Sequence, residues 1–404
     1  MGAGPGPSGS GAAAARKPAA ARRLLQATAL VSTLDRFAMP PMLIAIARDL
    51  GVPLTQVVQA ASVYFLAYGL MQPVWGMVSD RIGLIRTMRV ALLVAALATG
   101  VSALVAGQLG LAIARGVAGG TFSAGIPAGL VYLGDTVPPA ERQREITNLM
   151  SGSAIGTALG ASGAGVVAQL LSWRVTFVIT GLAALALVVA LRRLPPAPRH
   201  REGQRLGTAL GQVARSRVSW LVLLLAFGDG VVVLGVLTLL PAAVESTGVG
   251  AGVAGSVTAF YGFGMLVFAR VAGVLSLRLG RWQLPAMGAA AGVVGSGLVA
   301  LTRTPVAAVV TALLLGLAWA WLHSTMQTWA TEVLPSARAT VVSLFAGALF
   351  TGSAAAALLS AGPAEDGRYG AVFAVAAVLT VPLGVAAAVG RARWRPPADE
   401  GGAP

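Results

Sequence analysis

The chain has 404 residues, of which 56% are hydrophobic and 11% are charged, and its formal net charge is +15. A soluble domain carries roughly 25% charged residues, so this composition excludes an ordinary water-soluble protein and indicates a surface that mostly faces lipid. The chain has no cysteine and only two histidines. This excludes a disulfide framework and a thiolate metal site, and it leaves little material for histidine-based catalysis.

Apolar segments recur along most of the chain, each close to the length of about 20 residues that crosses a bilayer. They predict an all-α integral membrane protein with twelve transmembrane helices, at residues 24–47, 54–77, 88–108, 109–134, 146–170, 173–193, 218–243, 252–276, 283–302, 305–331, 338–361 and 369–390. The polar ends of the chain, residues 1–23 and 392–404, are expected to be disordered tails.

The positions of the basic residues predict how these helices are oriented. The excess of positive charge would favour a nucleic-acid partner in a soluble protein, but here most arginines and lysines lie in the tails and after every second helix. Positive residues collect on the cytoplasmic side of membrane proteins, so both termini are expected in the cytoplasm, in a cell (inner) membrane, with no nucleic-acid partner. The opposite side carries Arg48, Arg174, Arg303 and Arg368.

Two landmarks recur at one spacing and indicate an internal repeat. The sequence GMVSDRIG at residues 76–83 recurs as GVLSLRLG at 273–280, and DTVP at 135–138 recurs as EVLP at 332–335. Both landmarks are shifted by 197 residues. The repeat predicts two six-helix bundles in parallel orientation, at residues 24–193 and 218–391, joined by a basic cytoplasmic linker at 194–217.

The first copy of the repeated loop resembles a signature of the major facilitator superfamily, Gly-x-x-x-Asp-Arg-x-Gly-x-(basic), which lies between helices 2 and 3. Asp49 after helix 1, Arg115 in helix 4 and Trp173 at the start of helix 6 extend the resemblance. It implies two pseudo-symmetric six-helix bundles that move small molecules across the lipid bilayer by alternating access, without a cofactor and as a monomer. It also implies a gating motif made of Gly76, Asp80, Arg81, Gly83 and Arg86.

Ionisable side chains within the predicted spans are costly, at about 2.5–3.5 kcal/mol each on insertion scales, so each needs a partner or a water-filled cavity. They are Asp35 and Arg36 in helix 1, Arg115 in helix 4, Asp229 in helix 7 and His323 in helix 10. The family resemblance implies that helices 1, 4, 7 and 10 line the central cavity. These charges are therefore expected to face it.

Asp35 and Arg36 are neighbours on one helix and project about 100° apart, so they cannot neutralise each other well. We expect Asp35 to pair with Arg115, which matches the helix-4 arginine of drug–proton antiporters, and Arg36 to pair with Asp229 across the bundles. Burial raises the pKa of a carboxylate and a nearby arginine lowers it, which makes Asp35, Asp229 and Arg115 the candidates for proton coupling. The alternative is a static ion pair that fixes helix packing.

Two stripes of polar and aromatic side chains repeat every four residues. Tyr64, Tyr68 and Gln72 lie on one face of helix 2, and Trp319, His323 and Gln327 lie on one face of helix 10. Such stripes suit a cavity wall, so Arg36, Tyr64, Tyr68, Trp319, His323 and Gln327 are candidate substrate contacts. The alternative is hydrogen bonding and packing between helices.

The resemblance implies that Asp80 faces the positive N-terminal end of helix 11, near residues 336–340, and helps to close the cytoplasmic side. A carboxylate gains up to about 2 kcal/mol in such a position. Leu277 replaces this acid in the second copy, so the equivalent contact is expected to be weaker.

The predicted function is a secondary active transporter that couples protons to the export of small organic molecules or drugs. The alternative is a proton symporter that imports an organic anion or nutrient, because the arginines could bind a carboxylate. The glycine-rich helix 5 departs from the antiporter motif, since Ala161 stands where that motif has proline. An enzyme is not expected, because no cluster of catalytic side chains is visible.

Overall fold

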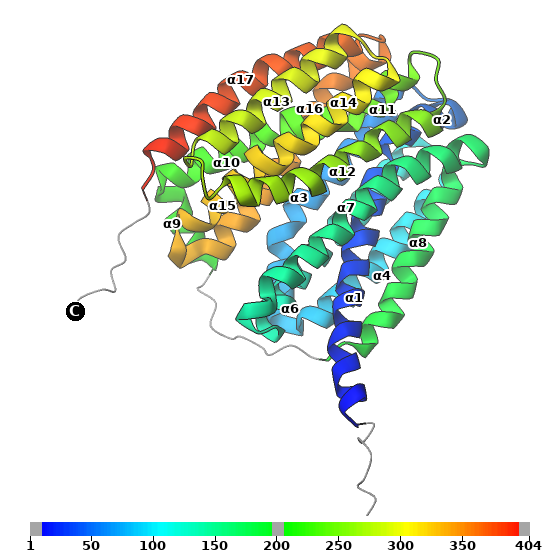
Figure 1. Ribbon diagram of the computed structural model, residues 1–404. Helices are drawn as coiled ribbons and strands as arrows, with labels where there is room; N and C mark the ends of the chain where they lie inside the picture. Colours follow the sequence, from blue (N-terminus) through cyan, green and yellow to red (C-terminus); the bar gives the residue numbers. More distant parts are fainter. Residues whose placement is uncertain (1–9, 196–205, 396–404) are drawn as a thin grey trace, which may run out of the picture.

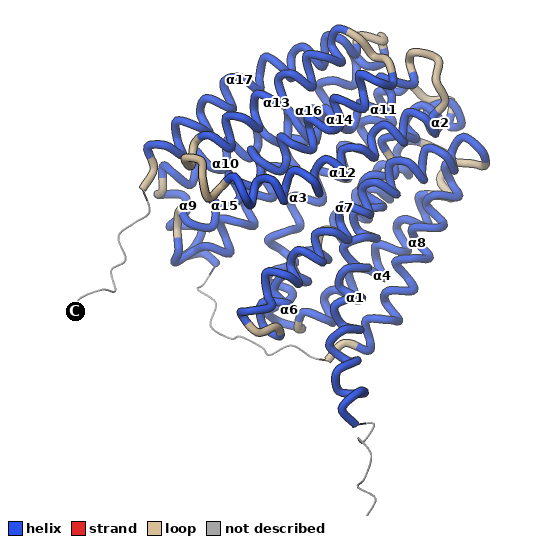
Figure 2. The backbone as a smooth tube through the Cα atoms, in the orientation of Figure 1, coloured by secondary structure: helices blue, strands red, loops and turns tan. Residues whose placement is uncertain are grey.

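The computed structural model describes residues 10–195 and 206–395. Within these residues, twelve helical segments are long and apolar enough to cross a membrane, which confirms the predicted fold class. Figure 2 shows the helices and the short loops that connect them. Residues 1–9, 196–205 and 396–404 lie outside the described residues, and so do His200 and parts of the predicted tails and linker.

The first six spans form the N-terminal bundle. Its elements are α1 (Ser10–Ala38), η1 (Pro40–Met42), α2 (Leu43–Leu50), α3 (Leu54–Ile82), α4 (Leu84–Ser102), α5 (Gln108–Phe122), α6 (Gly125–Thr136), α7 (Pro139–Leu170), α8 (Trp173–Ala190) and η2 (Leu191–Arg193). The helix α1 begins at Ser10, so it includes residues that the sequence assigns to a disordered tail.

The last six spans form the C-terminal bundle. Its elements are α9 (Leu206–Arg215), α10 (Arg217–Asp229), η3 (Gly230–Gly235), α11 (Val236–Glu245), α12 (Ala251–Leu275), α13 (Gln283–Leu301), α14 (Pro305–Ala318), η4 (Trp319–His323), α15 (Ser324–Glu332), η5 (Pro335–Ala337), α16 (Arg338–Glu365) and α17 (Tyr369–Arg393). The short helix α9 lies within the predicted linker, and its Ala209 and Val213 are buried.

Two glycines support the internal repeat. Gly51 ends span 1 with φ of 62°, and Gly248 follows span 7 with φ of 94°. These two positions are equivalent under the 197-residue shift. Because a side chain is strained in this left-handed region, glycine lets both chains turn sharply at matching places. The two bundles therefore share a backbone feature as well as sequence motifs.

Four of the described spans are interrupted near their middle, and they are spans 1, 4, 7 and 10. Pro40–Met42 forms a 3-10 turn in span 1, and a turn at Ser123 and Ala124 divides span 4. Gly230–Gly235 and Trp319–His323 are π-helical segments in spans 7 and 10. Such segments are frequent at functional sites. These four spans are the ones that carry Asp35, Arg36, Arg115, Asp229 and His323.

A row of glycines brings span 5 against span 1. A Cβ atom at Gly152, Gly156 or Gly160 would meet the backbone carbonyl oxygens of Gln26, Leu30 and Leu34, respectively. Glycine at every fourth position allows two helix backbones to touch, because no side chain separates them. The glycines of helix 5 therefore have a packing role in this fold.

The two bundles meet at one end. We call the side at which span 1 begins and span 12 ends the terminal face, and the opposite side the far face. Among the described residues, side-chain hydrogen bonds between the bundles lie at the far face: the backbone amide of Thr55 donates to Glu365 at 3.2 Å, and that of Gly252 donates to Gln169 at 2.8 Å. Figure 1 shows the bundles close together near α2 and α11 and apart near α6 and α15.

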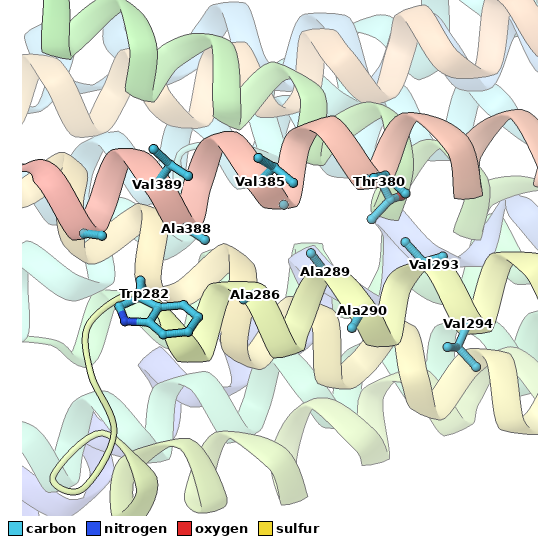
Figure 3. Close-up of a pocket in the computed structure, with 13 residues that line it drawn as sticks. Trp282, Ala286, Ala289, Ala290, Val293, Val294, Thr380, Val385, Ala388 and Val389 are labelled. Carbon is cyan, nitrogen blue, oxygen red and sulfur yellow. The ribbon is translucent and has the colours of Figure 1, made fainter.

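The outer surface of the C-terminal bundle carries an apolar groove of about 660 Å³ between α13 and α17. Figure 3 shows Trp282 at one end and Val294 at the other, with alanines and valines between them. Its lining contains no charged side chain. The lining is almost entirely aliphatic and offers a polar solute few hydrogen-bond partners, so we place the functional site elsewhere.

Candidate substrate and proton site

The N-terminal bundle buries an ion pair between spans 1 and 4. The two terminal nitrogens of Arg115 approach the two carboxylate oxygens of Asp35 at 2.6 and 3.2 Å. The side chain of Asp35 is 0% exposed and that of Arg115 is 1% exposed. The predicted pairing of these residues is confirmed, and its two-pronged geometry is the strong form of an arginine–carboxylate contact.

The surroundings of this pair satisfy the carboxylate and enclose the guanidinium. The hydroxyls of Thr99 and Thr180 donate to Asp35 at 3.3 and 3.4 Å. The guanidinium of Arg115 lies between the rings of Tyr64 and Phe177, 4.6 and 4.7 Å from their centres. The pair thus lies inside its own bundle rather than on the surface that faces the other bundle, because its partners come from spans 2, 3, 4 and 6.

Arg36 points away from this pair and is partly exposed. Its guanidinium lies 5.2 Å from the ring centres of Phe37 and Tyr68 and 5.4 Å from that of Phe350. Phe350 belongs to span 11, so Arg36 lies where the two bundles meet. Its Nε atom is buried without a hydrogen-bond partner, and no carboxylate among the described residues pairs with it.

The predicted pair between Arg36 and Asp229 is therefore wrong. One carboxylate oxygen of Asp229 instead lies 2.7 Å from Nδ1 of His323, within hydrogen-bond distance, and both side chains are buried. His323 comes from span 10 of the same bundle. The prediction failed because aromatic rings, and not a carboxylate, surround the guanidinium of Arg36 and stabilise it. The sequence pattern does not show which rings pack there.

A column of rings connects the buried pair with Arg36. Arg115 lies on Tyr64, the ring centres of Tyr64 and Tyr68 are 6.2 Å apart, and Tyr68 lies under Arg36. Both tyrosines are 2% exposed, and the hydroxyl of Tyr64 is buried without a partner. The stripe on helix 2 therefore joins two cations through stacked rings.

The helix-10 stripe continues from the second pair toward the terminal face. Trp319 stacks on His323 with ring centres 3.7 Å apart, and Tyr261 of span 8 lies 6.4 Å from Trp319. One turn beyond His323, Gln327 is exposed. Within this stripe Trp319 is partly exposed, His323 is buried and Gln327 is exposed. Their role as substrate contacts stays a prediction.

A family of known proteins matches the chain along most of its length. The family model described as Major Facilitator Superfamily matches residues 27–357 and 235–404. The chain belongs to this superfamily. It is therefore a multi-pass membrane protein and a secondary transporter, and it is not an enzyme.

Curated relatives match this transporter over shorter stretches. The hexuronate transporter of Escherichia coli (strain K12) is 32% identical over 143 residues, which are 35% of this chain and 33% of the relative. The galacturonate transporter of Dickeya chrysanthemi is 37% identical over 128 residues, which are 32% of this chain and 36% of that relative. The matches thus span about a third of the relatives' length. The expected place in the drug–proton antiporter branch gains no support from them.

Solved structures share the fold of the transporter. The nucleoside transporter NupG superposes with a TM-score of 0.75 at 15% identity and covers 93% of this chain and 100% of its own. A D-xylose–proton symporter superposes with a TM-score of 0.72 at 16% identity, over 89% of this chain and 96% of its own. At such low identity these likenesses show the fold alone.

The gating motif lies at the terminal face, away from the ion pairs. Gly83 ends α3 with φ of 90°, which explains why glycine stands there. Asp80, Arg81 and Arg86 are exposed, and Gly76 has open space around it. The residues near 336–340 do not bond to Asp80 in this conformation, because the bundles lie apart at this face. The gate role of Asp80 stays a prediction.

Sequence reasoning missed several aromatic residues of the site. They are Phe37, Phe177, Tyr261, Phe345 and Phe350. Tyr261 could have been found, because it occupies the position of Tyr64 in the repeat. The phenylalanines gave no signal, since single phenylalanines in an apolar span are indistinguishable from ordinary packing residues.

Proposed function

We propose that the protein is a proton symporter that takes up a small organic anion, with a uronic acid as the first candidate. The observation that carries the proposal is Arg36, a partly exposed guanidinium at the meeting of the bundles with no carboxylate partner among the described residues. A guanidinium presents a fork of N–H donors that matches a carboxylate. The printed names of the relatives, hexuronate and galacturonate transporter, support the same substrate class.

The aromatic frame suits this role. Rings of Phe37, Tyr68 and Phe350 contact the guanidinium near its faces, and a cation held in this way keeps its edge donors available. Trp319 is partly exposed and offers a flat ring, and Gln327 is exposed and offers an amide. A uronic acid would place its carboxylate on Arg36 and its sugar ring against Trp319 and Gln327.

Coupling to protons follows from the charge balance. Asp35, Arg36, Arg115 and Asp229 have formal charges that sum to zero. An anion that binds alone leaves an uncompensated negative charge in a medium of low dielectric constant, which is costly. Protonation of Asp35 removes one negative charge and loosens its contact with Arg115. The column of Tyr64 and Tyr68 then transmits this change to Arg36.

We propose that the terminal face is cytoplasmic in a cell inner membrane, because the basic residues collect there. The described conformation then opens to the cytoplasm and is closed outside by the contacts of Thr55 with Glu365 and of Gly252 with Gln169. Closure of the inner side brings Asp80 toward the N-terminal end of span 11. Rocking of the bundles between these two states gives alternating access.

The test uses the purified full chain in proteoliposomes. We expect uptake of labelled galacturonate that depends on an acidic outside medium, and no uptake of galactose, which has the ring but lacks the carboxylate. Arg36→Gln should raise the half-saturating concentration about tenfold to a hundredfold, which corresponds to loss of a charged hydrogen bond of about 1.5–3 kcal/mol. Arg270→Gln is the matched control, since Arg270 is exposed in span 8.

Proton-driven export of drugs is the second candidate, favoured by the arginine of helix 4. In the same vesicles, ethidium movement driven by a pH gradient, together with no galacturonate uptake, would replace our proposal by this one. The glycines of helix 5 do not favour export, because they are explained by packing against span 1.

A further inference from the structure

We infer that Asp229 and His323 form a second protonation site, so that the transporter moves two protons with each monovalent anion. The inference rests on the proposed symport and goes beyond it, because it fixes the stoichiometry. It also assigns His323 to proton binding, whereas the sequence pattern predicts this residue as a substrate contact.

The geometry of the pair is that of a proton-binding unit. Nδ1 of His323 and one carboxylate oxygen of Asp229 are 2.7 Å apart, and the side chains are 5% and 0% exposed. The other oxygen of Asp229 is buried and has no hydrogen-bond partner. A buried carboxylate with one unsatisfied oxygen is costly when charged. Such a pair has a reason to take up a proton.

The two buried pairs differ in what their cation can do. Arg115 stays charged at all physiological pH values, so its pair with Asp35 changes charge only at the carboxylate. Histidine is the one side chain whose ordinary pKa puts its charge change between about pH 5 and 8. The pair of Asp229 and His323 can therefore carry a negative charge or be neutral, and the difference is one proton.

The groups that face this pair are few. Tyr261 lies within electrostatic range of Asp229 and of Arg36, Trp319 stacks on the imidazole, and Phe345 lies 5.6 Å from it. The other ionisable residues on the described elements packed against the pair lie toward the ends of their helices: Arg215, Arg217, Glu245, Arg270, Glu332, Arg338, Glu365, Tyr369, Arg391 and Arg393. Away from the helix ends, the described cations are Arg36 and Arg115 of the N-terminal bundle, and of these Arg36 shares with Asp229 an electrostatic interaction with Tyr261.

The exposed residues of span 10 nearest to the pair lie on its terminal-face side. His323 is 4% exposed, but Gln327 and Thr328 on the next turn of the same span are exposed. The π-helical segment Trp319–His323 ends at this histidine, and Asp229 directly precedes the π-helical segment Gly230–Gly235. Both partners thus lie beside irregular turns, where a small change in helical register would alter the contact.

Histidine magnetic resonance tests the protonation itself, without any substrate. The chain contains two histidines, so the variant His200→Gln leaves His323 as the one labelled residue in protein that carries ¹⁵N-histidine and is held in lipid nanodiscs. We expect the ring-nitrogen signals of His323 to differ between samples at about pH 8 and about pH 5, and the difference to be altered in Asp229→Asn. Ring signals that are the same in both samples would overturn the inference.

The reversal potential of galacturonate flux tests the stoichiometry. One proton with one galacturonate moves no net charge, whereas two protons move one positive charge. We expect uptake by the wild-type chain to respond to an inside-negative potential at equal pH on both sides. His323→Gln should lose that response and keep uptake driven by a pH gradient.

Three outcomes separate the inference from the function on which it rests. Electroneutral uptake by the wild type, or full electrical response in His323→Gln, overturns the second proton site and leaves the symport standing. Absence of galacturonate uptake driven by a pH gradient in the wild type overturns the symport, and the two-proton stoichiometry with it.

Discussion

Asp35 in the N-terminal bundle and Asp229 in the C-terminal bundle are both 0% exposed, but the two bundles surround these carboxylates in different ways. Asp35 receives two contacts from Arg115 and hydrogen bonds from two threonines, so its oxygens are fully used. Asp229 has a single contact, with His323, and one oxygen without a partner. The comparison teaches that burial alone does not define how a proton site works. The partner decides which groups can change their charge: only the carboxylate can in the pair with Arg115, whereas both groups can in the pair with His323.

The difference between the two pairs predicts unequal losses of stability when Arg115 or His323 is replaced. Arg115→Gln leaves a buried carboxylate unpaired, which should lower stability by about 3–5 kcal/mol. His323→Gln removes a group that can be neutral and still supplies a hydrogen-bonding amide, so its cost should be smaller. Thermal unfolding of both variants in the same detergent measures this order.

The double variant Asp35→Asn with Arg115→Gln is the control for this prediction, since it removes both charges. It should regain most of the stability lost in Arg115→Gln. Equal stability of Arg115→Gln and His323→Gln would show that the two pairs do not differ as we describe.

Transport by the single variant Asp35→Asn tests the comparison further. It should abolish galacturonate uptake driven by a pH gradient and leave exchange of labelled for unlabelled galacturonate measurable, because exchange does not require a net proton movement. Full gradient-driven uptake in this variant would remove Asp35 from the coupling mechanism and leave the C-terminal pair as the proton carrier.

The gating loops extend the comparison to the terminal face, where the N-terminal bundle has Asp80 and the C-terminal bundle has Leu277. Asp80→Asn should slow turnover several-fold without a large change in half-saturation, because a carboxylate near a helix N-terminus contributes about 1–2 kcal/mol to closing the gate. Initial rates over a range of galacturonate concentrations test this. An unchanged maximal rate would contradict the gate role, and Leu277→Ala serves as the matched control in the other bundle.

Much of the fold could be predicted from the sequence because its physical causes are local. Runs of apolar residues define the spans, and the shift of 197 residues defines the two bundles. The pairing of Asp35 with Arg115 was predictable as well, since neighbours on a helix cannot pair and few other interior charges exist.

The remaining contacts of the site depend on distant packing. Arg36 lies among three rings from spans 1, 2 and 11, and no spacing in the sequence brings Phe350 beside it. The π-helical turn at Trp319–His323 places the indole on the imidazole, whereas a regular helical pattern predicts only a shared face. These features follow from how bundles fit together, which one sequence does not record.

The glycine contacts between spans 1 and 5 constrain how the transporter can move. Since the backbone of span 5 touches the carbonyl oxygens of Gln26, Leu30 and Leu34, span 1 cannot slide or rotate against span 5 without a steric clash. The two spans are then expected to move as one rigid unit, which carries Asp35 and Arg36 with it. A methyl group added at Gly156 would collide with the carbonyl oxygen of Leu30, so Gly156→Ala should push these two spans apart within the N-terminal bundle.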